Sequence, residues 1–318
     1  MYPMQLIAPC KDYLWGGSRL RTEFGKQSDK DIIAESWELS CHKDGISRIA
    51  NGEYAGMLLT EYLEQAGKAV LGTRGAAFQY FPVLIKLIDA RDNLSVQVHP
   101  DNEYALRVEG EYGKTEMWYI VDCEPGAELI YGFAQEISRE EFRRRIADNT
   151  LLEAVHRVPV HKGDVFFIAA GTLHAIGAGI LIAEIQQNSN TTYRVYDYGR
   201  VGADGKPRAL HIDKAAEVTR LAPAKPYPVS APEEHPGCTE TLLAKCDYFS
   251  ARKLELSGAA SLCAGAESFH HILLLEGEAT LTAGEDTLTL RKGASVFLPA
   301  GLGAYTLDGT GQAILTTV

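Results

Sequence analysis

The chain has 318 residues and a formal net charge of −11, with 46% hydrophobic and 23% charged residues. This length fits one large domain or two ordinary ones, and the composition is typical of a globular protein. The negative charge argues against general nucleic-acid binding, and no stretch approaches the roughly 20 apolar residues of a membrane span. The segment Met1–Ile7 lacks the basic flank and long apolar region of a signal peptide, so we expect a cytoplasmic protein without membrane or nucleic-acid partners.

Short β-strands separated by Gly-rich turns are predicted for most of the chain. The clearest strand patterns are Phe81–Asp89, Leu94–His99, Met117–Asp122, Asp164–Ala169, Ile180–Gln186, Tyr193–Tyr198, His271–Leu275, Ala279–Ala283 and Ser295–Pro299. Helical signals are few, and the first covers Thr60–Val70. A capping box at Ser138 predicts a helix that runs to about Ala147. A third helix is predicted over Asp213–Leu221, with Asp213 as its N-cap.

A proline-rich segment divides the chain. Residues 222–237 contain five prolines, and a run this rich in proline is excluded from the interior of a sheet. We interpret it as an extended connector. The predicted organisation is therefore a catalytic barrel with inserted helices over residues 1–221, the connector over 222–237, and a second, metal-free barrel over 238–318.

An internal similarity spans this connector. Residues 162–174, KGDVFFIAAGTLH, align without a gap with residues 292–304, KGASVFLPAGLGA, and His174 falls opposite Ala304. A glycine-bounded strand that ends in a turn recurs, but the histidine occurs only in the first copy. We infer two related β-barrels, of which only the first keeps a metal site; a chance match is the alternative.

The run Leu94–Pro100 is the first indication of a metal site. Side chains alternate along a strand, so Ser95, Gln97 and His99 share one face, with the last two roughly 6–7 Å apart. A buried amide without a partner costs about 1–3 kcal/mol, and a metal ion would satisfy it. The alternative for His99 alone is an ordinary core or surface histidine.

Two further residues complete a candidate ligand set. Glu116 begins an apolar strand, where a plain exposed carboxylate is the alternative, and His174 follows a glycine-bounded turn. One carboxylate among neutral ligands leaves a divalent ion with about +1 charge, which would polarise a bound hydroxyl or carbonyl. Lys114 would share the face of Glu116 if the strand extends that far. A lysine beside a metal ion loses its proton more easily, so Lys114 could relay protons; a surface lysine is the alternative.

An amide-rich segment over residues 184–192 leads into a strand that begins at Tyr193. Arg194 in this strand could be a surface residue, but its guanidinium group is the best-shaped side chain for a phosphate or carboxylate. A positive patch, or a solvated loop, is predicted shortly after it at Arg200, Lys206 and Arg208. The other histidines of this half are expected in structural or exposed positions: His156, His161, His211 and, in the connector, His235.

Taken together, these motifs resemble the type I mannose-6-phosphate isomerases, most closely their short bacterial form. The matching stretches are Gln97–Pro100, Lys114–Tyr119, Gly171–Ala175, Gln187–Ser189 with Arg194, Trp15–Gly17 and Glu35–Glu38. The resemblance spans the chain up to about Leu221, and the C-terminal part fits more loosely.

The resemblance implies a mainly β fold of two cupin-type jelly-roll barrels, with a few short helices inserted in or packed on the first. It implies a single zinc ion held by Gln97, His99, Glu116 and His174. It also implies two active-site residues, Arg194 and Lys114. The implied reaction interconverts D-mannose 6-phosphate and D-fructose 6-phosphate by proton transfer through an enediol. Either Lys114 or a water on the metal would move the proton, and Arg194 would meet the phosphate or the enediolate.

One position departs from the family pattern. Asn190 stands where longer members carry an aspartate, and an asparagine cannot accept a proton as a base. Two other function classes stay open. An iron-dependent cupin oxygenase would need ligands dominated by histidine and carboxylate, against which Gln97 argues. A sugar-binding or regulatory protein with a vestigial site would bind ligand without turnover. The physiological metal and a possible homo-oligomer are left open.

Overall fold

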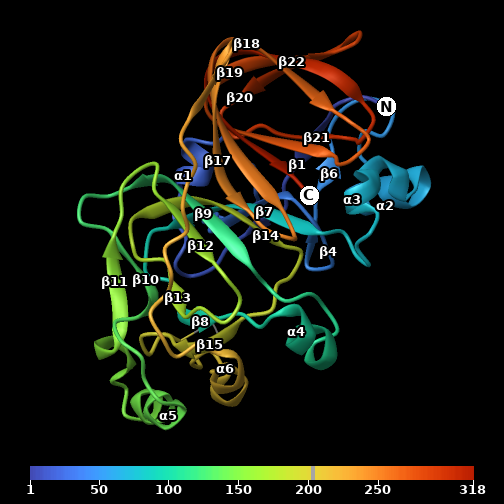
Figure 1. Cartoon of the computed structure of the whole chain (residues 1–318). Coiled ribbons are helices and arrows are strands. Elements are labelled where there is room, and N and C mark those ends of the chain that lie inside the picture. Colours follow the sequence, from blue (N-terminus) through green and yellow to red (C-terminus); the bar gives the residue numbers. More distant parts are fainter. Residues whose placement is uncertain (202–204) are drawn as a thin grey trace.

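The computed structural model describes residues 1–201 and 205–318, and its architecture is mainly β (Figure 1). The first large sheet contains, in spatial order, β12 (Val165–Ile168), β9 (Glu116–Cys123), β14 (Ile180–Gln187), β7 (Val83–Ala90), β3 (Glu35–Leu39) and β2 (Cys10–Lys11). The second contains β11 (Val155–Pro159), β10 (Glu128–Phe133), β13 (His174–Ala175), β8 (Val96–Val98) and β15 (Tyr193–Tyr196). These two sheets carry every residue of the predicted ligand set except His99, which directly follows β8.

The third sheet is built mainly from the C-terminal part of the chain. Its spatial order is β16 (Glu233–His235), β17 (Cys238–Lys245), β18 (Ser250–Ala264), β22 (Gly303–Thr317), β19 (His270–Ala283), β21 (Ser295–Leu298), β1 (Met4–Ile7) and β6 (Arg48–Ile49), with β20 (Asp286–Arg291) beside β19. A small separate ribbon pairs β4 (Cys41–His42) with β5 (Gly45–Ile46).

Short helices lie around the sheets (Figure 1). They are α1 (Arg19–Thr22), α2 (Leu59–Ala66), α3 (Gly72–Gly75), α4 (Asn102–Val108), α5 (Arg139–Ala147) and α6 (Ile212–Val218), with 3-10 turns η1 (Lys68–Leu71) and η2 (Leu151–Glu153). Among the described residues, no helix is both long and apolar enough to cross a membrane.

The predicted helix ends are partly right. The hydroxyl of Ser138 accepts a hydrogen bond from the backbone of Glu141, which confirms the cap of α5. The cap predicted at Asp213 is wrong, because α6 begins at Ile212 and Asp213 lies in its first turn, where a carboxylate complements the helix dipole. The first predicted helix ends early, because Gly67 adopts φ +78° and stops α2 before the 3-10 turn η1.

One buried core joins the first sheet to the C-terminal sheet. Ile85 and Tyr119 of the first belong to the same apolar cluster as Phe249 and Phe297 of the C-terminal part. The N-terminal segment also lies in the C-terminal sheet. Met4 of β1 pairs with Phe297 of β21, and Figure 1 shows blue β1 beside orange β21. The N-terminal strand therefore belongs spatially to the C-terminal sheet, while the predicted division of the chain stays a prediction.

The strand order of the first sheet recurs in the third. The antiparallel series β7-β14-β9-β12 has the same chain order and pairing as β18-β22-β19-β21. Strands β12 and β21 begin at Val165 and Ser295, the residues that the gapless sequence alignment places opposite each other. This repetition supports the predicted internal similarity. The two strands predicted on either side of residue 276 form one long strand, β19, whose register shifts between Leu274 and Glu276.

Candidate metal centre and active site

The strand pairing brings the four predicted ligands together. Gln97 of β8 lies opposite His174 of β13, and Glu116 begins β9. Oε1 of Glu116 is 3.4 Å from Nε2 of His174 and 3.8 Å from Nε2 of His99. The side-chain amide nitrogen of Gln97 is 3.4 Å from Nε2 of His174, and a half-turn of this amide would present its oxygen there instead. The ligand atoms of the two histidines and the glutamate all lie within 4.8 Å of one another, so one cation can contact all three.

Both histidines are held in the tautomer that leaves Nε2 free to bind a metal ion. Nδ1 of His99 is 2.8 Å from the carbonyl oxygen of Thr191, and Nδ1 of His174 is 2.8 Å from that of Thr172. A carbonyl only accepts, so each Nδ1 carries the hydrogen and each Nε2 lone pair points toward Glu116. Burial lowers the pKa of His99 well below its ordinary value and that of His174 to about 4. Both rings are therefore neutral, as imidazole rings that bind a metal ion must be.

Three buried atoms at this point have no hydrogen-bond partner among the described residues, Nε2 of His99 and both carboxylate oxygens of Glu116. Oε2 of Glu116 forms an ion pair with Lys114, whereas Nε2 of His99 and Oε1 of Glu116 lie 3.8 Å apart, and both residues are at most 1% exposed. Leaving buried polar atoms unpaired is costly, and a cation placed between them would satisfy both. Imidazole nitrogen with carboxylate and amide oxygen is a donor set that divalent transition metals accept. The residues present therefore fit a metal ion.

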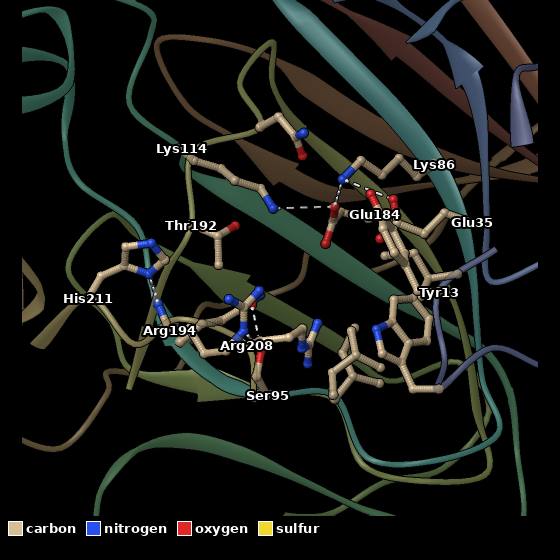
Figure 2. A pocket seen from close by; sticks show the side chains of 16 residues that line it. Tyr13, Glu35, Lys86, Ser95, Lys114, Glu184, Thr192, Arg194, Arg208 and His211 are labelled. Atoms are coloured by element: carbon tan, nitrogen blue, oxygen red, sulfur yellow. Dashed lines mark hydrogen bonds and ion pairs between the residues drawn. The ribbon is translucent and has the colours of Figure 1, made fainter. Parts of the chain in front are cut away.

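A buried network of charges adjoins the predicted ligand set, and Figure 2 shows four of its members, Lys114, Glu184, Lys86 and Glu35. Lys114 Nζ is 2.8 Å from Oε2 of Glu116 and 3.6 Å from Oε1 of Glu184. Lys86 Nζ is 3.2 Å from the same oxygen of Glu184 and 3.6 Å from Oε2 of Glu35. Three carboxyl groups thus meet two lysines, so this network has no excess of positive charge that would repel a bound dication.

The protonation of two carboxylates is set by their surroundings. Burial and the charge of Glu184 raise the pKa of Glu116. Burial also acts to raise that of Glu184, but Lys114 and Lys86 outweigh it and lower the pKa. The indole of Trp118 donates a hydrogen bond of 2.9 Å to Oε2 of Glu184. Glu184 therefore stays ionised beside Glu116.

Sequence reasoning missed the partners of this network, Lys86, Glu35 and Glu184. A signal was present: the stretches VLIKLIDA of β7 and ILIAEIQQ of β14 are buried throughout, and each contains a charged residue among apolar ones. A charge in such a strand requires a partner. The pairing register supplies it, because Lys86 lies opposite Glu184.

A cavity of about 260 Å³ opens beside these groups. Its lining includes Gln97, Lys114 and Glu184 as well as Arg194 and Arg208. Figure 2 shows the lysines and carboxylates on one side and the arginines on another. The cavity therefore has one region lined by buried lysine and carboxylate side chains and another lined by two arginines.

Arg194 lies directly opposite Gln97 in the pairing of β15 with β8. Its Nε donates to Oγ of Ser95 over 3.1 Å, and one terminal nitrogen donates to the carbonyl of Ala209 over 3.2 Å. The backbone N–H of Arg194 donates to Nδ1 of His211, which also lines the cavity. The sequence-based expectation that His211 is merely structural or exposed therefore misses its place in this lining.

The carboxylate of Asp197 fixes two of the cationic residues predicted in the loop. Arg208 donates to both of its oxygens, over 2.7 and 2.5 Å, and Arg200 donates to Oδ1 over 2.5 Å. Only Arg208 of this pair lines the cavity. Asn190 lines it as well, and its amide donates a hydrogen bond of 2.8 Å to Oδ2 of Asp44.

Comparison with known proteins identifies relatives along the whole chain. Residues 4–120 match the family model "Phosphomannose isomerase type I, catalytic domain", and residues 239–318 match "Mannose-6-phosphate isomerase, cupin domain". A mannose-6-phosphate isomerase of Streptococcus mutans is 39% identical over 96% of this chain and 95% of its own length. Mannose-6-phosphate isomerase ManA of Bacillus subtilis is 41% identical over 96% of each chain. The crystal structure of a Bacillus subtilis mannose 6-phosphate isomerase superposes with a TM-score of 0.93, at 36% identity over the full length of both chains.

Proposed function

The chain belongs to the type I mannose-6-phosphate isomerases, and on this premise we propose that it interconverts D-mannose 6-phosphate and D-fructose 6-phosphate through an enediol. The observation that carries the proposal is the convergence of His99, Glu116 and His174 on one buried point next to Lys114. Zinc is the ion we propose, held by these three residues and the amide oxygen of Gln97. Such a set of nitrogen and oxygen ligands suits it.

The charge distribution of the cavity suits a hexose phosphate. Arg194 and Arg208 supply positive charge for a phosphate group, and Asp197 holds the second guanidinium group in place. The region beside Glu116 and Lys114 is polar and buried, which suits the carbonyl and hydroxyl groups at C1 and C2. A substrate with an anion at one end and an aldose or ketose group at the other fits both regions.

Bound zinc would withdraw electrons from substrate oxygens and stabilise the negative charge that develops when the proton leaves carbon. The protein residues would hold the ion and keep its ligands in position. Glu116, His99 and His174 hold the ion, and the carbonyls of Thr191 and Thr172 hold the two imidazole rings.

Lys114 is the group we assign to proton transfer between C1 and C2. Its Nζ lines the cavity and lies 2.8 Å from Glu116. The other buried lysine is less suited: burial acts to lower the pKa of Lys86, but Glu35 and Glu184 outweigh it and raise the pKa. Lys86 thus remains an ammonium ion, and Lys114, which contacts the proposed metal ligand Glu116, is the lysine placed to exchange a proton with the substrate.

Isomerisation in deuterium oxide tests the mechanism. Transfer through an enediol predicts that deuterium enters C2 of mannose 6-phosphate and C1 of fructose 6-phosphate, observed by proton NMR. Complete retention of the carbon-bound proton would point to a hydride shift and contradict the proposal. Lys114→Met should keep one equivalent of metal by elemental analysis while losing isotope exchange. Retained exchange in that variant would remove Lys114 from the proton path.

A further inference from the structure

The two histidines of the proposed metal centre are held in position by different parts of the chain. His174 contacts the carbonyl of Thr172, two residues away in the same turn. His99 contacts the carbonyl of Thr191, which lies 92 positions away in the segment between β14 and β15. That segment belongs to no strand, so the orientation of the His99 ring depends on whatever holds Thr191 in place.

A carboxylate behind this segment holds it. Oγ1 of Thr191 donates a hydrogen bond of 2.7 Å to Oε1 of Glu111, whose Oε2 lies 2.9 Å from Nε2 of His42. The backbone N–H of Asp44 donates to Nδ1 of His42 over 3.2 Å, so the ring hydrogen is on Nε2 and points at Glu111. Both oxygens of the carboxylate are therefore engaged, and hydrogen bonds to an ionised group are among the stronger ones in proteins.

The surroundings keep this carboxylate charged and apart from the substrate. Burial acts to raise the pKa of Glu111, but the hydrogen bonds from His42 and Thr191 outweigh it and lower this pKa to about 2. Glu111 and His42 line a second cavity, together with Tyr80 and Tyr112, and neither lines the cavity that holds Lys114. Glu111 thus has no direct path to the substrate in the site described above.

The same segment has a second anchor at the same place. The amide of Asn190 donates to Oδ2 of Asp44, one of the two residues that join β4 to β5. Two neighbouring residues of the segment, Asn190 and Thr191, are therefore tied to the β4–β5 ribbon, the second of them through Glu111 and His42.

We propose that Glu111, supported by His42, is a positioning residue of the metal centre that fixes Thr191 and through it the imidazole of His99. The inference rests on the proposed metal site. Residues behind a metal ligand typically change metal affinity by about 10- to 100-fold when they are removed. In this structure the support for His99 runs through the side chains of Thr191, Glu111 and His42 to the β4–β5 ribbon.

The test compares metal affinity in variants of the full chain. Thr191→Val removes the hydroxyl with little change of volume, and Glu111→Ala removes its acceptor. Thr191→Ser keeps the hydroxyl. Tyr193→Phe is the matched control, because it breaks another hydroxyl–carboxylate bond of 2.7 Å, to Glu109, two residues further along. Zinc dissociation constants are measured by competition with a chromophoric chelator, and the His99 imidazole is followed by nitrogen-15 NMR in the metal-free proteins.

The valine and alanine variants should bind zinc about 10- to 100-fold more weakly, while the serine and phenylalanine variants stay within about threefold of the original chain. The double variant Thr191→Val with Glu111→Ala should be no weaker than the poorer single one, because both act through one contact. In Thr191→Val the His99 signal should broaden or shift.

Unchanged zinc affinity in folded Thr191→Val would overturn the inference, even if its melting temperature fell, because the residue would then be merely structural. If Glu111→Ala does not fold, the valine, serine and phenylalanine variants still decide the question. An original chain that binds no zinc would instead refute the proposed metal site, so the two failures are distinguishable.

Discussion

Lys86 and Glu184 lie directly opposite each other on strands β7 and β14, with Nζ of the lysine 3.2 Å from Oε1 of the glutamate. Their side chains are 4% and 3% exposed. Neither charge could be buried alone, since desolvation of an unpaired ion costs several kcal/mol. The pair therefore places an ionised carboxylate next to Lys114 and Glu116, and it links the packing of the first sheet to the chemistry of the cavity.

Breaking this pair should destabilise the fold. We expect Lys86→Met to lower the free energy of unfolding by about 3–5 kcal/mol, because Glu184 and Glu35 lose a buried cation. Lys86→Met combined with Glu184→Gln should be less destabilised than the single variant. Urea titrations of the metal-free proteins measure both. The exposed pair of Arg74 with Glu267 is the control: Arg74→Met should change stability by less than about 1 kcal/mol. A double variant that is less stable than Lys86→Met would contradict the role of the pair.

Removal of the anionic ligand should abolish metal-dependent stabilisation. A ligand at about 100 times its dissociation constant stabilises the folded state by about 2.7 kcal/mol. We expect zinc to raise the melting temperature of the original chain and to leave Glu116→Gln unchanged, as measured by thermal unfolding with zinc and with chelator. Equal zinc-induced shifts in the two proteins would show that the ion binds elsewhere.

Arg208 should govern affinity for the phosphate group. Hydrogen bonds to charged groups contribute about 1.5–3 kcal/mol, so Arg208→Gln should raise KM for mannose 6-phosphate roughly 10- to 100-fold. Inhibition by inorganic phosphate should weaken in parallel. Arg200 contacts the same Asp197 without lining the cavity, and Arg200→Gln should alter KM far less. Steady-state kinetics of the two variants test this prediction. Similar increases of KM in both variants would indicate that both arginines act only by holding the loop in place.

Asn190→Asp should harm the protein rather than restore an aspartate function. The asparagine amide donates to Asp44 over 2.8 Å, so a carboxylate in its place would lose the hydrogen bond and face a like charge. We expect lower stability and lower kcat/KM, with partial recovery when Asp44→Asn is added. A single variant with higher kcat/KM than the original chain would show that the position acts as a base.

Acid should destabilise the C-terminal sheet through His271. Burial lowers the pKa of this fully buried residue to about 3 from an ordinary value of 6.5. The unfolded chain therefore binds the proton first, and stability is lost as pH falls from about 6.5 toward 3, by about 1.4 kcal/mol per pH unit. His271→Gln should show a shallower loss in urea titrations across that window. Replacing the exposed His156 is the control, and an unchanged slope in His271→Gln would refute the assignment.

Strand alternation alone placed Gln97 and His99 on one face, and the glycine-bounded turn indicated His174. The partners in the buried charge network cannot be predicted from sequence in the same way. Lys86 and Glu184 are separated by almost 100 residues, and only the pairing of β7 with β14 brings them together. Local patterns contain no information about such register, nor about the contact that links Glu111 to Thr191.

The misplaced cap of α6 and the unpredicted pairing of β1 also have physical causes. The cap of α6 was misplaced by two residues because Asp213 favours the first turn as well as the N-cap. Strand β1 could not be assigned to the C-terminal sheet, since four residues of a short strand do not specify a partner almost 300 positions away. Predictions from sequence were therefore best where the alternation of a single strand determines which side chains lie together.

The decisive measurement of the proposed function is turnover of mannose 6-phosphate to fructose 6-phosphate before chelation, after chelation, and after zinc is added back. We expect activity that is lost with the metal and regained with zinc, together with one bound ion per chain. A folded chain that carries its metal and converts no substrate would contradict the proposed function.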